Sequence, residues 1–245
     1  MRGQLEFEVK RYPGTAGRLL FIWGFGCNDK QPGMGWFLER LLKKKYDVTC
    51  VQLPTEITDF KDQILRKLED IEKGLGDHVS VGFSYGGLAL SFLFGSSRRI
   101  FISPFWGVNE RWRMKGDEAI ATVLSVVPKP LIKRKFDTAD AGALAVDDDL
   151  IGIPERISFR SVHQFFEAQK ALPGPRQNDF VFYTRDDLVV SPEVIDNRIR
   201  EFGIEHRTYN GSHIFYLDEE REETMIGILG EIDRSFLVDG CLSPS

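Results

Sequence analysis

One serine of the sequence stands between two glycines at the spacing of a strained nucleophile turn. The run Gly82-Phe83-Ser84-Tyr85-Gly86 follows a short apolar stretch and precedes a helix-like one. A turn this sharp between a strand and a helix needs small residues two positions before and two after the serine. The serine Oγ then projects from the end of a sheet, where free N–H groups of the helix favour an oxyanion. Ser84 is the candidate nucleophile, and the alternative is a glycine-rich turn with an incidental serine.

A serine nucleophile needs a base, and the sequence holds four histidines. His213 follows an Asn-Gly-Ser turn just beyond the last predicted strand, at the same end of the sheet as Ser84. It is the candidate base. His78 precedes the strand that leads to Ser84, so we expect it to be solvated at the opposite end. His163 and His206 are expected to be structural, on a helix face and within a strand.

Two consecutive aspartates could orient the imidazole. Asp186 and Asp187 follow the apolar strand predicted at 180–183, so both lie at its carboxyl end. Either carboxylate could accept a hydrogen bond from the histidine Nδ1. We favour Asp187, because the residues that follow it turn the chain back into a helix. Asp186 also fits a solvated loop charge or a helix cap. The order along the chain is serine, aspartate, histidine.

The elements that must position these residues alternate in type along the chain. Short apolar runs predict strands at 19–23, 48–51, 79–83, 100–102 and 180–183. Amphipathic stretches predict helices at 34–44, 59–73, 87–94, 192–202 and 217–237. Apolar strands of this kind are buried on both faces, and their alternation with helices implies right-handed crossovers. We therefore expect the α/β class, with a mostly parallel central sheet flanked by helices.

Three further segments complete the expected architecture. Residues 5–12 alternate like an edge strand that turns through Pro13-Gly14 into the strand at 19–23, and 205–209 resembles a half-exposed last strand. Residues 105–176 are too long for a plain connection, and prolines punctuate their helical pattern. We expect this segment to be a helical cap insertion within a single domain of residues 1–245.

Taken together, the motifs resemble those of the α/β-hydrolase family over essentially the whole chain. Gly82–Gly86 resembles the nucleophile elbow, Asp187–Pro192 the acid loop, and Asn210–His213 the histidine loop. The order serine, aspartate, histidine is the family's own and differs from the orders of both major serine-protease classes. The resemblance implies the α/β-hydrolase fold, with Ser84, Asp187 and His213 as its catalytic residues.

The resemblance also implies an oxyanion hole. Its loop corresponds to Trp23-Gly24-Phe25-Gly26, so the backbone N–H groups of Phe25 and Tyr85 would be the donors. The family often has a histidine, which is not the base, where this chain has Trp23. Many members also have a glycine-rich loop where this chain has Thr55-Glu56-Ile57-Thr58. This departure predicts a differently built flank of the pocket.

Aromatic residues gather where this arrangement places the mouth of the site. The predicted substrate pocket comprises Trp23, Trp36, Phe105, Trp106 and Trp112, and packing of the cap on the sheet is the alternative for each. An aromatic pocket suits an uncharged acyl or aryl group. The same cap carries the basic residues Arg111, Arg113, Lys115, Lys129, Lys133, Arg134 and Lys135. They could recognise an acidic carrier, although such a run is more often a solvated face.

Composition narrows the class of protein further. Of the 245 residues, 42% are hydrophobic and 12% aromatic, and the formal net charge is -5. These values exclude a disordered chain, and mild acidity argues against general nucleic-acid binding. No apolar run has the length of a membrane-spanning helix. Three widely spaced cysteines and a start without a signal-peptide pattern predict a cytoplasmic protein. No ligand spacing suggests a metal, and we expect no cofactor.

These predictions define a serine hydrolase that cleaves a carboxylic ester or a related acyl compound of small size through an acyl-enzyme. Ester, thioester and amide cleavage use the same residues, so the motifs do not separate them. One alternative is a thioesterase or acyltransferase acting on a carrier-bound acyl group. Another is a non-catalytic ligand-binding member of the fold. Dehalogenase and epoxide-hydrolase chemistry is disfavoured, because those relatives have an aspartate in the place of Ser84.

Overall fold

A seven-stranded sheet forms the centre of the computed structural model, which describes residues 5–110, 131–133, 143–154 and 156–238. The strand order is β1-β3-β2-β4-β5-β8-β9. The strands are β1 (Glu8–Tyr12), β2 (Arg18–Ile22), β3 (Asp47–Gln52), β4 (Val79–Phe83), β5 (Arg98–Ile102), β8 (Phe180–Tyr183) and β9 (Glu205–Thr208). Every neighbouring pair is parallel except β1 with β3. The predicted α/β class with a mostly parallel sheet is confirmed.

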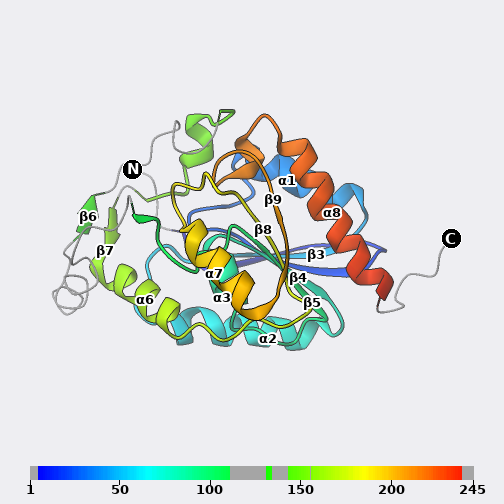
Figure 1. Cartoon of the computed structure of the whole chain (residues 1–245), viewed down its shortest axis with the longest axis horizontal. Helices are drawn as coiled ribbons and strands as arrows, with labels where there is room; N and C mark the ends of the chain where they lie inside the picture. The colour runs from blue at the N-terminus through cyan, green and yellow to red at the C-terminus, as the bar shows by residue number, and fades with distance from the viewer. Residues whose placement is uncertain (1–4, 111–130, 134–142, 155, 239–245) are drawn as a thin grey trace.

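Helices cover both faces of this sheet (Figure 1). One face carries α1 (Pro32–Lys43) and α8 (Arg221–Val238), which follows a 3₁₀ turn η4 (Phe215–Leu217). The other carries a π-helical turn η1 (Lys61–Leu65) that continues into α2 (Arg66–Leu75), together with α3 (Tyr85–Leu90) and α7 (Pro192–Phe202). Successive residues of β2 alternate between the two cores: Leu19 and Phe21 belong to the first, Leu20 and Ile22 to the second. Because successive side chains face two different cores, a strand of this kind has apolar residues at consecutive positions.

The N-terminal strand β1 lies at the edge of the sheet and leads into β2, as predicted. Its partner, which the sequence did not indicate, is β3: the two strands are antiparallel, with Glu8 opposite Gln52 and Tyr12 opposite Val48. Both edges of β2 are already occupied by its parallel partners β3 and β4. The free edge of β3 is therefore the place left for β1. At the other end of the sheet, all four residues of β9 are exposed, and not half-exposed as predicted.

The segment predicted as a helical cap contains more than helices. Its described residues form the 3₁₀ turn η3 (Asp147–Leu150), the helix α6 (Phe159–Lys170) and a two-stranded antiparallel sheet of β6 (Leu131–Lys133) and β7 (Arg156–Ser158). The helix is fastened to the core, since Ser161 Oγ accepts the Ile57 N–H at 2.8 Å and Gln164 Oε1 accepts the Phe60 N–H at 2.9 Å. The predicted organisation as one domain with a cap at 105–176 stays a prediction.

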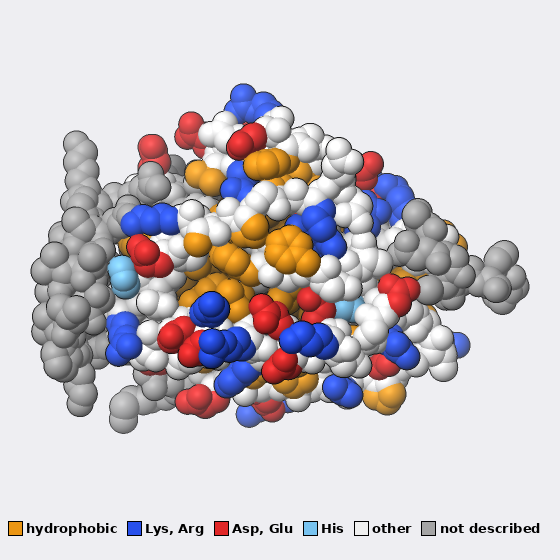
Figure 2. Space-filling model, turned by 90° about the horizontal axis from the view of Figure 1, so that it is seen from below, with side chains coloured by type: hydrophobic (Ala, Val, Ile, Leu, Met, Phe, Trp, Pro, Cys, Tyr) orange, Lys and Arg blue, Asp and Glu red, His pale blue; other side chains and the backbone are white. Residues whose placement is uncertain are grey.

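The helix layer around α2 is not polar throughout. Figure 2, which views the molecule from this side, shows apolar side chains gathered in the middle of the face and bordered by charged ones. Phe94, which follows α3, and Phe202, at the end of α7, are large apolar residues that remain exposed. Among the helices described, none is both long and apolar enough to cross a lipid bilayer.

Candidate active site

Ser84 occupies the turn between the carboxyl end of β4 and the start of α3. Its φ of 52° and ψ of −114° are unfavourable for a residue with a side chain, and such strain is concentrated at functional sites. Two glycines make the turn possible. A Cβ on Gly82 would lie 2.7 Å from the Gly86 carbonyl oxygen, and a Cβ on Gly86 would lie 2.1 Å from that of Ile22. The glycine spacing of the motif is thus required by close backbone contacts.

Three of the predicted site residues meet beside this turn. His213 Nε2 lies 2.8 Å from Ser84 Oγ, and His213 Nδ1 lies 2.7 Å from Asp187 Oδ2. All three side chains are buried. Because the carboxylate faces Nδ1, the proton of the neutral imidazole resides there, and Nε2 accepts the serine hydroxyl. The arrangement can remove a proton from Ser84 and stabilise the cation that results.

The structure distinguishes the two candidate aspartates. Asp187 is buried, and its Oδ1 accepts the backbone N–H groups of Val189 and Val190, each at 2.8 Å. These bonds orient the carboxylate so that Oδ2 faces the imidazole. Asp186 is exposed, and its N–H donates to Thr184 Oγ1 at 3.2 Å. Asp187, and not its neighbour, contacts His213.

The loop that carries His213 is held by residues that sequence reasoning missed. Asp218 Oδ2 accepts both the Ser212 N–H at 2.7 Å and the Ser212 hydroxyl at 3.0 Å. Burial raises the pKa of Asp218. The Tyr209 hydroxyl lies 2.8 Å from Ser103 Oγ and donates to the His213 carbonyl oxygen at 3.4 Å. Nothing in the sequence pattern singles out these two side chains, since their partners come from turns whose shape only the fold defines.

Replacing Asp218 by alanine is expected to lower the free energy of unfolding by about 1–3 kcal/mol, because the Ser212 N–H and hydroxyl lose their acceptor. The same loss frees the residue next to His213, so kcat for an ester substrate should fall more than KM rises. Urea unfolding and steady-state kinetics of the two proteins check this. Exposed Asp186→Ala is the matched control. Equal kinetics for wild type and Asp218→Ala would show that the loop does not need this carboxylate.

The other three histidines lie on other elements of the fold. His78 is buried just before β4, and its Nδ1 lies 2.6 Å from the Gly76 carbonyl oxygen. Its Nε2 lies 3.7 Å from the Glu72 carboxylate. The expectation of a solvated His78 is therefore wrong, because the end of α2 folds over it. His163 lies on α6, and His206 lies exposed on β9.

The loop expected to form one side of an oxyanion hole is a tight turn. The Cys27 N–H donates to the Gly24 carbonyl oxygen at 3.1 Å, and Gly26 has a φ of 74°. Gln31 braces the loop, since its Nε2 donates to the Gly26 carbonyl oxygen at 3.0 Å. The hydrogen bond that closes this turn does not use the N–H of Phe25. Tyr85 is the first residue of α3, so its N–H is also outside the helical hydrogen bonds.

Side chains next to Ser84 form an aromatic cluster, which we define as Phe25, Phe60, Tyr85, Phe105 and Phe165. The Tyr85 ring centroid lies 4.9 Å from that of Phe165, 6.0 Å from Phe25 and 6.2 Å from Phe60. Phe105 contacts Phe165 at 5.8 Å, and its N–H donates to the Ser84 carbonyl oxygen at 2.9 Å. Phe60 and Phe165 were missed, although both lie on predicted helical faces. The cluster brings the loop after β2, the residue that precedes η1 and the cap helix α6 together around Tyr85.

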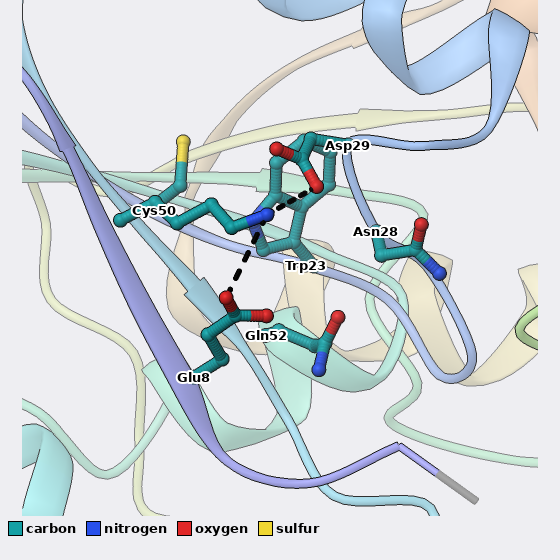
Figure 3. Close-up of a pocket in the computed structure, with 7 residues that line it drawn as sticks. Glu8, Trp23, Asn28, Asp29, Cys50 and Gln52 are labelled. Atoms are coloured by element: carbon teal, nitrogen blue, oxygen red, sulfur yellow. Dashed lines mark hydrogen bonds and ion pairs between the residues drawn. The ribbon is translucent and has the colours of Figure 1, made fainter. Parts of the chain in front are cut away.

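Trp23 does not line a substrate pocket as predicted. Its side chain is 3% exposed and packs edge-on against Phe21 at 5.0 Å. It borders a cavity beside β1 and β3 (Figure 3). At this cavity Lys10 Nζ lies 2.6 Å from Asp29 Oδ1. The cavity is lined by Glu8, Lys10, Trp23, Asn28, Asp29, Cys50 and Gln52. Its volume of about 10 Å³ is that of roughly one water molecule, too small for an acyl chain.

Two further tryptophans are also explained by packing and not by a pocket. The Trp36 ring lies between two guanidinium groups, with Arg40 at 4.3 Å and Arg221 at 4.7 Å from its centroid. Trp106 is 4% exposed, and its Nε1 donates to Ser91 Oγ at 2.8 Å. The predictions for both are therefore corrected: apolar contact and cation–π stacking hold these rings.

The other predicted features of the cap are not described. Trp112 and the basic residues Arg111, Arg113, Lys115, Lys129, Arg134 and Lys135 lie outside the described residues, as does the side chain of Lys133. Within the part of the chain that the structure describes, no group of three or more histidine, cysteine, aspartate or glutamate side chains could hold a metal ion.

Comparison with known proteins defines the class of fold. The sequence matches no protein-family model and no curated protein, whereas the fold matches many solved structures. The monoacylglycerol lipase of Paleococcus ferrophilus is similar with a TM-score of 0.77 and 16% identity, covering 94% of this chain and 100% of that chain. A soluble variant of monoglyceride lipase from Saccharomyces cerevisiae has a TM-score of 0.75 and 20% identity, covering 94% and 91%.

A third similar structure extends this comparison. It comes from work on carboxylesterases of the thaumarchaeon Nitrososphaera gargenis, with a TM-score of 0.58 and 17% identity, covering 95% of this chain and 99% of that chain. The chain has the α/β-hydrolase fold, as its motifs predicted. Fold alone does not define an activity, which has to be argued from the site.

Proposed function

We propose that this protein is a serine hydrolase that cleaves a carboxylic ester or a related acyl compound of small size. The observation that carries the proposal is the continuous chain of contacts from Ser84 Oγ through His213 to Asp187, at 2.8 and 2.7 Å. It begins at a serine held in a strained turn. A nucleophile, its base and the group that orients the base are the three parts that acyl transfer requires.

The proposed reaction uses these residues in sequence. His213 Nε2 takes the Ser84 proton as Oγ attacks the substrate carbonyl carbon, and Asp187 stabilises the imidazolium. The N–H groups of Phe25 and Tyr85 bind the oxyanion of the tetrahedral intermediate. The imidazolium then protonates the leaving group, and the acyl group remains on Ser84. Water, deprotonated by the same imidazole, attacks the acyl-enzyme and releases the acid.

The surroundings of Ser84 favour an uncharged acyl group. Four of the five side chains in the aromatic cluster are phenylalanines, which offer apolar contact and no counter-charge. The similar structures named above are lipases and carboxylesterases, in agreement with this chemistry. A non-catalytic member of the fold is the less favoured alternative, because all three triad side chains are in contact. The carrier-dependent alternative rests on basic residues that the structure does not describe.

A fluorophosphonate probe tests the proposal, because it forms a covalent bond only with an activated serine. We expect one adduct per wild-type chain, located on the peptide that contains Ser84, and none on Ser84→Ala. Ser103→Ala is the matched control, since Ser103 is also a buried serine with positive φ at the end of a neighbouring strand. Absence of labelling, or labelling that persists in Ser84→Ala, contradicts the proposal. A screen of p-nitrophenyl esters of increasing acyl length, with matched thioesters and amides, then identifies the substrate class.

A further inference from the structure

The Tyr85 hydroxyl is buried without a hydrogen-bond partner. Its side chain is 1% exposed, and among the described residues no acceptor or donor lies within hydrogen-bond distance of the hydroxyl oxygen. The other five tyrosines of the sequence each have one. Their hydroxyls pair with Asp29 (Tyr12), Asp233 (Tyr46), Asp196 (Tyr183), Ser103 (Tyr209) and Cys27 (Tyr216). Tyr85 is thus the exception among them.

An unpaired hydroxyl in this place costs free energy that a phenylalanine ring would not. Water would satisfy the group in the unfolded chain, and burial removes that water. Burial also raises the pKa of Tyr85 well above its ordinary value, so the hydroxyl keeps its proton and is a donor. What the site lacks is therefore an acceptor.

The position of Tyr85 relates this donor to the proposed reaction. Tyr85 directly follows Ser84 in the chain, and its ring contacts both Phe25 and Phe165 of the cap helix. The backbone N–H of the same residue is a proposed oxyanion donor. Residue 85 thus adjoins Ser84 in the chain, and its ring belongs to the aromatic cluster, whose member Phe105 donates its N–H to the Ser84 carbonyl oxygen at 2.9 Å.

We propose that the Tyr85 hydroxyl is a specificity-determining donor for an oxygen atom within the acyl group, separate from the scissile carbonyl. The proposal rests on the proposed hydrolase function and deepens it: the substrate is an ester of an otherwise apolar acyl group that carries an ether, ketone or hydroxyl oxygen. A carboxylate is a poorer acceptor here, because no Lys or Arg of the described ranges stacks on the rings of the aromatic cluster to compensate its desolvation.

Paired substrates measure this recognition. We would compare p-nitrophenyl hexanoate with chain-matched esters in which one methylene at a time is replaced by an ether oxygen, using wild type and Tyr85→Phe. The measured quantity is kcat/KM for an ether ester divided by kcat/KM for the hexanoate. For at least one ether ester this ratio should be roughly three- to tenfold lower in Tyr85→Phe than in wild type, because one neutral hydrogen bond is lost. Tyr46→Phe removes a hydroxyl that pairs with Asp233, outside the residues described around Ser84, and should leave this ratio unchanged. A ratio that is the same in wild type and Tyr85→Phe for every ester overturns the inference.

Thermal unfolding provides a second readout that does not need turnover. Tyr85→Phe should have a melting temperature equal to or above that of wild type, because no internal hydrogen bond is lost. Tyr209→Phe should have a lower one, because Ser103 loses its partner. A decrease in Tyr85→Phe as large as that in Tyr209→Phe would mean that the hydroxyl has an internal partner, and would overturn the inference.

The two proposals fail in distinguishable ways. If Ser84 is labelled and esters are hydrolysed, but the ester ratio is the same in wild type and Tyr85→Phe, only the proposal for the Tyr85 hydroxyl is contradicted. Absence of labelling and of turnover in wild type contradicts the hydrolase function, and the inference about its acyl group falls with it.

Discussion

Replacing Asp187 by asparagine should lower kcat for an ester substrate by about 10⁴-fold, with little change in stability. The reason is the orientation of the side chain. Asp187 Oδ1 accepts two backbone N–H groups, from Val189 and Val190, and only an oxygen can do so. In the variant the amide oxygen keeps that position, and the amide NH₂ faces His213 Nδ1. The imidazole must then carry its proton on Nε2, where it can no longer accept the proton of Ser84.

Asp186→Asn is the matched control for this prediction. The two aspartates are adjacent in the sequence and lose the same charge on substitution, but Asp186 is exposed and Asp187 contacts the imidazole. We expect kcat of Asp186→Asn to remain within about twofold of wild type, as for a surface substitution away from the site. Steady-state kinetics with one activated ester, together with circular dichroism to establish folding, provide the measurement. Similar decreases of kcat in Asp187→Asn and Asp186→Asn would show that the effect of Asp187 on the reaction does not come from its contact with His213.

Replacing Asp179 by leucine should lower the free energy of unfolding by about 3–5 kcal/mol, a large part of the stability of an ordinary domain. Asp179 and Arg99 are both fully buried, and the carboxylate accepts from Arg99 Nε at 2.9 Å and from its Nη2. Without Asp179 the guanidinium remains in the core as an uncompensated charge. Its Nη1 donates to the carbonyl oxygens of Ser91 and Leu93, each at 3.0 Å, just beyond the end of α3. The variant should therefore also loosen the helix that begins beside Ser84.

Urea unfolding of Asp179→Leu and Glu205→Leu separates the effect of burying an ion pair from the effect of losing one carboxylate. Glu205 also pairs with an arginine, since its carboxylate lies 3.2 Å from Arg98 Nη2, but its side chain is 65% exposed. Exposed pairs contribute little, so Glu205→Leu should cost less than about 1 kcal/mol. Equal losses in the two variants would contradict the special importance of the buried pair.

Local sequence signals predicted the fold class and the bounds of several elements. The predicted strand at 79–83 has the bounds of β4, and the predicted helix at 192–202 has those of α7. Both signals are physical: strands buried on two faces must be apolar throughout, and a helix with one buried face must repeat its apolar residues. The turn at Ser84 was equally visible, because only glycine tolerates the backbone contacts on either side of it.

Long-range placement was predicted less well. All the tryptophans were assigned to the mouth of the site, yet Trp23, Trp36 and Trp106 lie in the core or against arginines. The side chain of an aromatic residue near a functional loop can point to either face of the sheet. Neither the residue's type nor its position in the sequence says which face it is. The pairing of β1 with β3 was missed for a similar reason: it depends on which strand edge the remaining chain leaves free.

The sequence by itself determined the class of fold, the nucleophile turn and the candidates for the base and the acid, because these depend on periodicity and on contacts within a few residues. Only the tertiary structure decided between Asp186 and Asp187, brought Phe165 of the cap helix beside Tyr85 and placed Asp218 under the histidine loop. Those contacts join segments that are far apart in the chain or meet across a turn. Their existence depends on the direction of each side chain at the carboxyl end of the sheet, which no local pattern encodes.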